Sequence, residues 1–557
     1  MSKETQASST TSADVLASLQ AENAQLRMEI QAQLTSLQAT IAALREENQL
    51  LLRRLYGNRT ERGKTTETQL SFDDLVKAEK ALQKQLDDAR QLAAAFEKTP
   101  EESPSGDEPA KKRKPAGRRN LAQSSLPRIE VEIDDPRFEG IYPRSGFDVS
   151  YQLYLKRSSY AVLVKNTVKY MVTNAQGTSE LSAAQPKSLF ERGLLHTSAI
   201  ADIITRKFSR GEPLARQEQH FTSADSSIDR GTMSRYVEQA GNTFGATVCN
   251  AMWQDAIKNA GVISTDATGA AIQPEGPSQV KQACKKGHFF TAVVDDSAVL
   301  FHYVPEHTKQ AVKSLFGDFR GFLQADAHHV YNVLEKPPPQ LGNTDQDEPR
   351  VTLVGCWAHC RRYFFEAALC RHEVGVQGLM RIAGIYILDR AIMKLPRSKR
   401  TQARQEKVLP LLDAFFSWAK QVQPSAPRSR AARALGYALN QENELRAVLL
   451  NPDVPLDNTR AERALRKIVV GRKNWLFYGS NCHAEAAAAI FSLIATCRLH
   501  RIDPQQYFDE LMRVLPYWPK DRHLELAPQH WSATRARLHQ AELDKLISPI
   551  TVPPPLG

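Results

Sequence analysis

The sequence predicts a mixed α/β fold in which a strand-rich segment is followed by a long helical insertion. Three patterns support this prediction. Apolar strand-like runs lie between residues 260 and 335, helical periodicity fills 372–450, and helical patterns return at 459–515. Alternation with a period of two indicates strands, whereas apolar residues three or four positions apart indicate helices.

The composition favours an intracellular protein with a polyanionic partner. The 557 residues carry 73 Lys and Arg against 62 Asp and Glu, a formal charge of +11, although an ordinary basic protein would show the same excess. Seven cysteines form no regular framework, which fits free thiols in a reducing compartment. The N-terminus lacks the apolar core of a signal peptide, and no apolar run approaches the ~20 residues that span a bilayer. We therefore expect a cytoplasmic protein with no membrane partner.

Residues 14–56 have the pattern of a coiled coil. Apolar residues and one asparagine recur every seven positions, at Leu16, Asn23, Ile30, Leu37, Leu44 and Leu51. A period near 3.5 predicts self-association through this helix, and a buried asparagine can fix the register. The alternative is one long helix that packs on its own protein.

A short helix is expected near 73–96, and residues 98–126 read as a flexible linker rich in Pro, Ser, Glu and Lys. Basic residues crowd into this linker at Lys111, Lys112, Arg113, Lys114, Arg118 and Arg119. Such a run is typical of a phosphate-binding arm, or of a segment that only improves solubility.

Residues 128–175 alternate in a strand-like fashion, and 196–257 are helical. Two helices, Ala215–Ala224 and Gly231–Ala240, suggest a helix-turn-helix. The second would offer polar side chains to DNA, namely Arg230, Thr232, Ser234 and Arg235. Helix pairs joined by short turns are also common in domains that never touch DNA.

Residues 260–335 read as a strand, a hairpin, a helix and a second strand. The first strand covers Gly261–Ala271, the hairpin joins His288–Val294 to Val299–Val304, the helix covers Thr308–Phe319, and the last strand covers Gly321–Asp326. This order is how a ribonuclease-H-like α/β core begins.

Asp266 ends the apolar part of the first strand, after Val262 and Ile263, and Asp326 ends the last strand, after Phe322 and Leu323. Carboxylates at the carboxyl ends of neighbouring strands meet at one edge of a sheet, where open α/β sheets place their sites. Two such carboxylates repel each other unless a cation lies between them, and oxygen ligands suit Mg²⁺ or Mn²⁺. Alternatively, each aspartate simply starts a turn.

Glu462 allows two interpretations. Thr459 and Glu462 match a capping box, in which the glutamate closes the start of its own helix. In the other interpretation its carboxylate points from the first helical turn towards the two aspartates. The same helix is strongly basic, and the residues expected to contact DNA are Arg466, Arg472, Lys473 and Trp475. For the aromatic residues, burial beside a turn is the alternative.

Cys356, His359 and Cys360 form a short cluster that resembles half of a zinc site. Zinc requires four ligands, and no second ligand pair stands at a suitable spacing. We therefore expect no bound zinc.

Several of these segments together resemble the insertion-sequence-66 family of bacterial transposases. The resemblance is strongest in the run from Leu456 to Phe477 and continues to Pro504; Cys356 to Phe364 and Leu323 to Asp326 also match. It implies a DDE transposase with a ribonuclease-H-like fold that acts on the terminal repeats of its own mobile element and on target DNA. It also implies that Asp266, Asp326 and Glu462 are catalytic residues that hold two Mg²⁺ or Mn²⁺ ions.

The resemblance also assigns His359 to a position close to the site, and it leaves open whether helper proteins from the same element take part. Two departures stand out. The family usually carries a cysteine-rich zinc module near 130–175, but the first cysteine of this chain is Cys249. Asp266 is followed by Ala267, where the family usually has a second acidic residue. In addition, Ala327, His328 and His329 replace the usual Gly-Tyr stretch. Two other functions stay open, a catalytically silent DNA-binding protein descended from a transposase and a stand-alone nuclease.

These patterns divide the chain into eight segments. They are a coiled coil at 1–60, a short helix and basic linker at 61–127, a small β-rich region at 128–195, a helical DNA-binding region at 196–257, the first part of the core at 258–371, the helical insertion at 372–450, the rest of the core at 451–530 and a C-terminal tail at 531–557. The helical pattern at 459–515 is interrupted by a segment bounded by Gly471 and Gly479, and the last residues, Pro553 to Gly557, are expected to be disordered.

Overall fold

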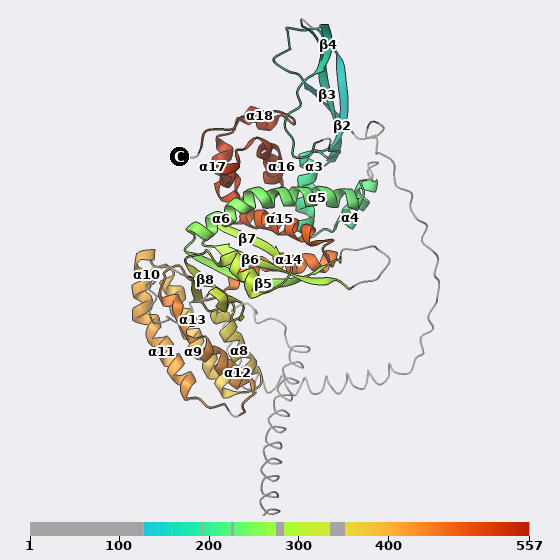
Figure 1. Cartoon of the computed structure of the whole chain (residues 1–557). Coiled ribbons are helices and arrows are strands. Elements are labelled where there is room, and N and C mark those ends of the chain that lie inside the picture. Colours follow the sequence, from blue (N-terminus) through green and yellow to red (C-terminus); the bar gives the residue numbers. More distant parts are fainter. Residues whose placement is uncertain are drawn as a thin grey trace, which may run out of the picture. The chain divides into compact units, whose positions relative to one another are not determined.

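The structure is a computed structural model. It describes Ala122 and residues 127–156, 159–174, 177–191, 193–223, 228–274, 283–334, 351–424 and 426–555. The coiled coil, the helix near 73–96 and the basic residues of the linker lie outside these residues. The chain forms two compact units, which are described separately (Figure 1). The smaller comprises, of the described residues, 360–390 and 407–442.

The larger unit contains a mixed five-stranded sheet in the order β7-β6-β5-β8-β9. Strands β5, β6 and β7 are antiparallel neighbours, whereas β8 runs parallel to β5 and β9 runs parallel to β8. Their bounds are β5 Val262–Ile272, β6 Lys285–Val294, β7 Ala298–Val304, β8 Phe322–Gln324 and β9 Thr352–Val354. The predicted strand, hairpin and second strand are therefore confirmed, and so is the helix between them, α7 (Lys309–Phe316).

The edge strand β7 is protected by helix α15 (Asn481–Leu499). The backbone N–H groups of Val299 and Phe301 donate to the hydroxyls of Thr496 and Ser492, at 3.1 and 2.7 Å. Because these hydroxyls lie one helical turn apart, they satisfy backbone groups that an open edge would leave exposed. α15 is long and apolar enough to cross a membrane, but 67% of that stretch is buried inside the protein, as in a core helix.

Helix α5 packs on the other side of α15 through a close glycine contact (Figure 1). A Cβ at Gly241 would lie 2.5 Å from the carbonyl oxygen of Ala486, so only glycine permits this approach. Helix α5 covers Arg230–Phe244, and the other helices of this unit are α3 Thr197–Ile204, α4 Leu214–Ser223, α6 Asn250–Asn259, α10 Arg397–Ala403, α13 Glu442–Arg446 (except Glu442), α14 Thr459–Trp475, α16 Pro504–Val514, α17 Pro528–Ala536 and α18 Gln540–Asp544.

Short 3₁₀ or π-helical turns extend or connect these helices. They cover Thr205–Arg210, Gly245–Cys249, Tyr331–Leu334, Arg404–Val408, Ala447–Leu449, Leu515–Tyr517 and Lys520–Leu526. Two sequence predictions are corrected in this region. Helix α14 continues through Gly471 to Trp475, where a break was expected. The expected disorder from Pro553 onwards is wrong for Pro553 and Pro554, whose carbonyls each accept a 2.9 Å hydrogen bond from Arg522.

A second, smaller sheet confirms the strand-like pattern at 128–175. Its strands are β1 Arg128–Ile133, β2 Arg144–Lys156, β3 Ser159–Asn174 and β4 Gly177–Ser182, and β3 pairs with the other three. An apolar cluster formed by Val168, Tyr170, Val172 and Ala183 packs this sheet. Apolar side chains therefore provide cohesion in a segment that contains no cysteine.

The smaller unit consists of helices, as predicted for the insertion. Its main elements are α8 Trp357–Leu369, α9 Glu373–Ile392, α11 Leu409–Gln421 and α12 Arg430–Asn440, of which α8 and α9 each have one end in the larger unit. The rings of Phe364 and Phe415 pack at 5.8 Å, and the Trp418 ring N–H donates to Gln377 at 3.0 Å. Aromatic burial thus joins α8, α9 and α11.

Candidate active site

Asp266 and Asp326 lie level with each other on neighbouring parallel strands. Ser264 of β5 pairs with Gln324 of β8, and both aspartates follow two residues later in the same direction. The Ser264 hydroxyl also donates to the side-chain oxygen of Gln324 at 3.1 Å, which locks this register inside the core. The two aspartates are therefore neighbours in register, although Asp266 lies inside β5, which continues to Ile272, and not at the end of its strand as the sequence pattern indicated.

Both carboxylates act on one buried hydroxyl. Burial raises the pKa of Tyr331, and the negative charges of Asp326 and Asp266 raise it further. Tyr331 lies in the turn that follows the β8 edge and is 3% exposed. Its hydroxyl is thus kept protonated by burial and by two carboxylates, a role that local sequence patterns do not signal.

The start of helix α14, which carries Glu462, is tied to β5 beside Asp266. The helix begins after Asn458, and the buried side-chain amide of Asn458 donates to the carbonyl oxygen of Thr265 at 2.5 Å. Glu462 follows one turn later, and its backbone N–H donates to the carbonyl of Asn458 at 3.1 Å. A chain of two hydrogen bonds therefore links the residue before Asp266 to Glu462.

The capping-box interpretation of Glu462 is not supported by this geometry. It requires Thr459 at the N-cap, but the N-cap is Asn458, whose side chain makes no capping bond to the helix. Instead, Oε1 of Glu462 lies 3.8 Å from Nε2 of His359, and both side chains are about three-quarters buried, at 26% and 21% exposure. Glu462 thus faces a histidine rather than its own helix start.

His359 belongs to a segment that holds the beginning of α14. The Sγ atom of the buried Cys356 accepts a hydrogen bond from the backbone N–H of Asn458 at 3.2 Å, and the ring N–H of Trp357 donates to the carbonyl of Leu445 at 3.0 Å. Burial raises the pKa of Cys356 to about 11, so the thiol stays protonated at neutral pH. Cys356 and Trp357 act as structural supports for the helix that carries Glu462.

Histidines crowd around the Asp326 strand end. The His307 ring lies 4.7 Å from that of His328 and 5.3 Å from that of His288, and His328 stacks on His329 at 4.5 Å. Burial lowers the pKa of His307, and the neighbouring His328 and His288 lower it further. Because stacked rings present faces rather than converging nitrogens, this arrangement is not that of a metal site.

Carboxylates offer oxygen ligands, but these three do not form a closed metal site in the part of the chain that the structure describes. Within the ranges that the structure describes, no three His, Cys, Asp or Glu side chains are gathered closely enough to hold a metal ion. The structure brings Asp266 and Asp326 together and connects Glu462 to them through Asn458 and Thr265.

Comparison with known proteins identifies the family. Residues 192–486, more than half of the chain, match the family described as Transposase IS66 family, and this region contains all three carboxylates. The chain belongs to the IS66 transposase family. Two further regions of this IS66 family transposase match the IS66 C-terminal element, at residues 492–529, and Transposase C of IS166 homeodomain, at residues 43–131.

Relatives of this IS66 family transposase include proteins of Sinorhizobium fredii (strain NBRC 101917 / NGR234). It is 25% identical to Uncharacterized protein y4qI over 440 residues, and this matched region covers 76% of this chain and 78% of the relative. It is 26% identical over 413 residues to Uncharacterized protein y4hP, covering 70% and 72%. These names state no activity.

The predicted DNA-contacting residues on α5 have mixed surroundings. Arg230 and Arg235 are exposed, but the Ser234 hydroxyl hydrogen-bonds His483 of α15 at 3.1 Å. Thr232 lies in the first turn, where its backbone N–H donates to Asp229 at 2.6 Å. The two predicted helices are present, yet one face of the second is buried against α15.

Of the residues on α14 that were predicted to contact DNA, two are exposed and two contact other parts of the protein. Arg466 and Lys473 are exposed, whereas Arg472 donates to the Thr268 hydroxyl of β5 at 3.2 Å. Trp475 packs edge-on against Phe208, with ring centroids 5.9 Å apart, so its ring contributes to the core. Of the two interpretations of Trp475, DNA contact or burial beside a turn, the structure supports the second.

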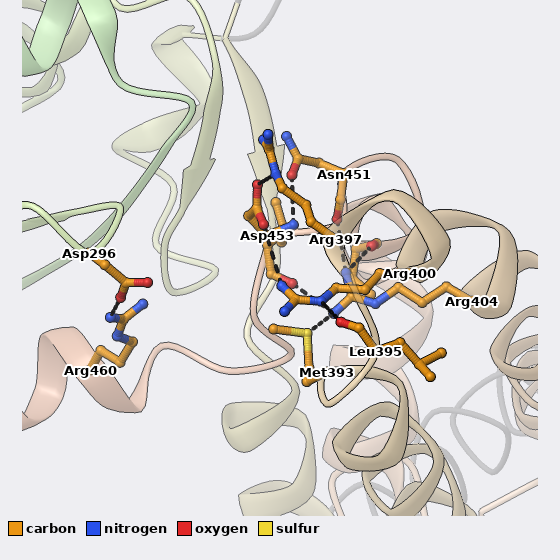
Figure 2. Close-up of polar contacts among 11 residues, drawn as sticks. Asp296, Met393, Leu395, Arg397, Arg400, Arg404, Asn451, Asp453 and Arg460 are labelled. Carbon is orange, nitrogen blue, oxygen red and sulfur yellow. Dashed lines mark hydrogen bonds and ion pairs between the residues drawn. The ribbon is translucent and has the colours of Figure 1, made fainter.

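A buried arginine, which no local sequence pattern indicates, holds the segment that leads into α14. Arg404 is fully buried and donates to the carbonyls of Val448, Asn451 and Val454 at 2.8, 2.9 and 2.9 Å (Figure 2). Arg397 forms an exposed ion pair with Asp453 at 2.6 Å in the same region (Figure 2). The Arg404 guanidinium satisfies three backbone groups of a segment without regular secondary structure.

Proposed function

We propose that this IS66 family transposase cuts and joins DNA at a metal-dependent centre formed by Asp266, Asp326 and Glu462, acting on the ends of its own insertion sequence. The observation that carries the proposal is the pairing of Ser264 with Gln324, which sets the two aspartates level on parallel strands. Asp326 follows the carboxyl end of β8, which is the kind of position where open α/β sheets place their sites.

The sheet topology supports a ribonuclease-H-like catalytic core. Three antiparallel strands are followed by a helix and two parallel strands, in the order β7-β6-β5-β8-β9. The first aspartate lies on the central strand β5, and the second follows its neighbour β8. The helical insertion then separates the second aspartate from Glu462.

The ligand chemistry fits divalent magnesium or manganese. All three proposed ligands are carboxylates, which these hard cations prefer, and the nearby Cys356 thiol is held protonated by burial. When bound, two such ions would activate the attacking water or 3′-hydroxyl and stabilise the departing oxygen. The residues fit these ions by their donor atoms and their place along the strands; in the described structure the three carboxylates do not form a closed cluster.

The protein's own residues have distinct supporting roles in this proposal. Asn458 holds the start of α14 against β5, and His359 orients the carboxylate of Glu462. The exposed Arg466 and Lys473 on the same helix are placed to contact phosphates of the bound DNA. Loss of a supporting group should therefore impair catalysis while DNA binding persists.

The N-terminal region is proposed to supply binding and assembly. The match to Transposase C of IS166 homeodomain at residues 43–131 supports a DNA-binding role there, and the heptad pattern at 14–56 supports self-association. We expect the protein to act on DNA in the bacterial cytoplasm. Whether helper proteins from the same element take part stays open.

A strand-transfer assay tests the proposal. The full chain is incubated with Mg²⁺, a duplex carrying an end of the element and a supercoiled target, and wild type is compared with Asp326→Asn. Joined product from wild type alone is the expected result. Binding without cleavage would instead indicate a silent DNA-binding descendant of a transposase, and cleavage without joining would indicate a nuclease.

A further inference from the structure

Helix α14 ends in a turn that carries two large apolar side chains into solvent. Leu476 is 68% exposed and Phe477 is 43% exposed. Leu476 also has a φ of +67°, a backbone conformation that residues other than glycine rarely adopt. Strained backbone of this kind is retained where the surrounding structure enforces it, and it concentrates at functional sites.

The residues before the turn are firmly anchored. Asn474 donates from its side chain to the carbonyl of Gly211 at 2.8 Å, and Trp475 is packed against Phe208. Within the turn, the backbone N–H of Phe477 donates to the carbonyl of Trp475 at 2.8 Å. The helix side of the turn therefore has no freedom to fold the two apolar side chains back into the core.

The residue after the turn is anchored as well. Tyr478 is buried, its ring lies 5.2 Å from that of Phe289, and its backbone pairs with the end of β5. Its N–H donates to Ala271 at 2.9 Å, and its carbonyl accepts from Gln273 at 2.8 Å. The exposed pair thus sits at the tip of a rigid support, and its exposure is enforced by contacts on both sides.

The charge around this tip is strongly positive. Helix α14 contains six Lys and Arg and one acidic residue, Glu462. Arg460 is exposed but pairs with Asp296, and the other exposed basic side chains are Arg463, Arg466, Lys467 and Lys473. Cations that hold phosphates beside an apolar tip are the chemistry by which proteins insert side chains between base pairs and kink the duplex.

We propose that Leu476 and Phe477 form a wedge that enters double-stranded DNA and unstacks one base step. The wedge requires a DNA partner, as the proposed function does, but it requires no cleavage. Along α14 the wedge lies 14 residues (476 minus 462) beyond Glu462, which is about 21 Å of helix. If α14 runs along the duplex, this length corresponds to roughly six base pairs at 3.4 Å each.

The test uses the full chain, without divalent cations, and duplexes of mixed sequence that contain flexible TA steps. A single 2-aminopurine in each duplex reports unstacking as a rise in fluorescence. The double variant Leu476→Ala/Phe477→Ala is compared with wild type and with Leu450→Ala, a control whose leucine is 63% exposed elsewhere in the same unit. The salt dependence of binding is measured in parallel.

Wild type and the Leu450→Ala control should raise the fluorescence at one position, and the double variant should bind with an unchanged salt slope but without the rise. A rise that survives in the double variant would overturn the wedge. A double variant that keeps the rise and loses self-association in sedimentation would show that the tip docks a second copy of the chain. Unstacking without any Mg²⁺-dependent strand transfer would overturn the proposed function and leave the wedge standing.

Discussion

The side-chain amide of Asn458 donates a hydrogen bond to the backbone carbonyl of Thr265, the residue immediately before Asp266. One contact therefore joins the strand that carries the first aspartate to the helix that carries Glu462. Because Asn458 is fully buried, neither group of this pair can exchange its partner for water.

Asn458→Ala should lower both stability and activity. The change leaves the Thr265 carbonyl without this donor, which costs about 1–3 kcal/mol for a buried group. The thermal unfolding midpoint and Mg²⁺-dependent strand transfer are measured together. Asn451→Ala, at a surface turn where the side chain accepts only from the Asp453 N–H, serves as the control. Equal behaviour of the two variants would show that Asn458 has no special role at the site.

Glu462→Gln should abolish most strand transfer while folding and DNA binding persist. Loss of a residue that only supports a metal ligand costs about 10–100-fold, so loss of a ligand should cost at least about 100-fold. Binding persists because phosphate contacts come from Lys and Arg. The exposed Glu485→Gln is the matched control. Normal transfer by Glu462→Gln would refute the assignment of Glu462.

His359→Ala should reduce strand transfer by about 10–100-fold, the range for residues that orient a metal ligand. His359→Gln keeps a hydrogen-bonding group near Glu462 and should recover part of the activity. The informative measurement is the Mg²⁺ concentration needed for half-maximal transfer, which should rise in His359→Ala. An unchanged Mg²⁺ requirement would mean that His359 acts elsewhere.

Arg404→Met should destabilise the larger unit by at least about 3 kcal/mol, because it removes charged hydrogen bonds from three buried carbonyls. The control is Arg397→Met. Its ion pair with Asp453 is formed by a side chain that is 72% exposed, and such pairs contribute about 0–1 kcal/mol. Similar losses of unfolding midpoint in both variants would contradict the bracing role of Arg404.

Gly241→Ala should destabilise the protein by about 1–3 kcal/mol, because the new methyl group would meet the Ala486 carbonyl at 2.5 Å. Gly245→Ala is the control on the same helical segment, since its Cβ would lie an ordinary 3.6 Å from Ala489. It should be neutral, or stabilising by up to about 1 kcal/mol. If both substitutions were tolerated, α5 and α15 would not be in close contact.

The core strands could be predicted because buried strands have a clear apolar pattern, and Asp326 follows the end of one of them. Asp266 was expected at a strand end but lies inside β5, which continues to Ile272. That Glu462 completes a ligand set with them remains a prediction, although the capping box that competed with it does not form. The capping pattern gave a wrong prediction because Asn458, not Thr459, is the N-cap residue, and its side chain hydrogen-bonds β5 instead of the helix. Local spacing contains no information about a partner 193 residues away.

Other features escaped prediction for related reasons. Arg404 lies in a helical stretch where an arginine normally faces water, and only the three carbonyls it meets explain its burial. Trp475 looked suited to stacking on a base, but the glycine one turn earlier in α14, Gly471, leaves room for its ring to pack inward. The exposed apolar residues proved to be its successors, Leu476 and Phe477.

The helical insertion also sets the order in which the centre is assembled during synthesis. Asp326 and Glu462 are 136 residues apart (462 minus 326). At about 5–20 residues per second, a ribosome needs on the order of ten seconds to make this stretch. During that interval the nascent chain contains both aspartates and the strands that align them, but not the helix that carries the glutamate. A chain released early therefore contains two of the three carboxylates, so premature termination yields a protein without the proposed complete cutting centre.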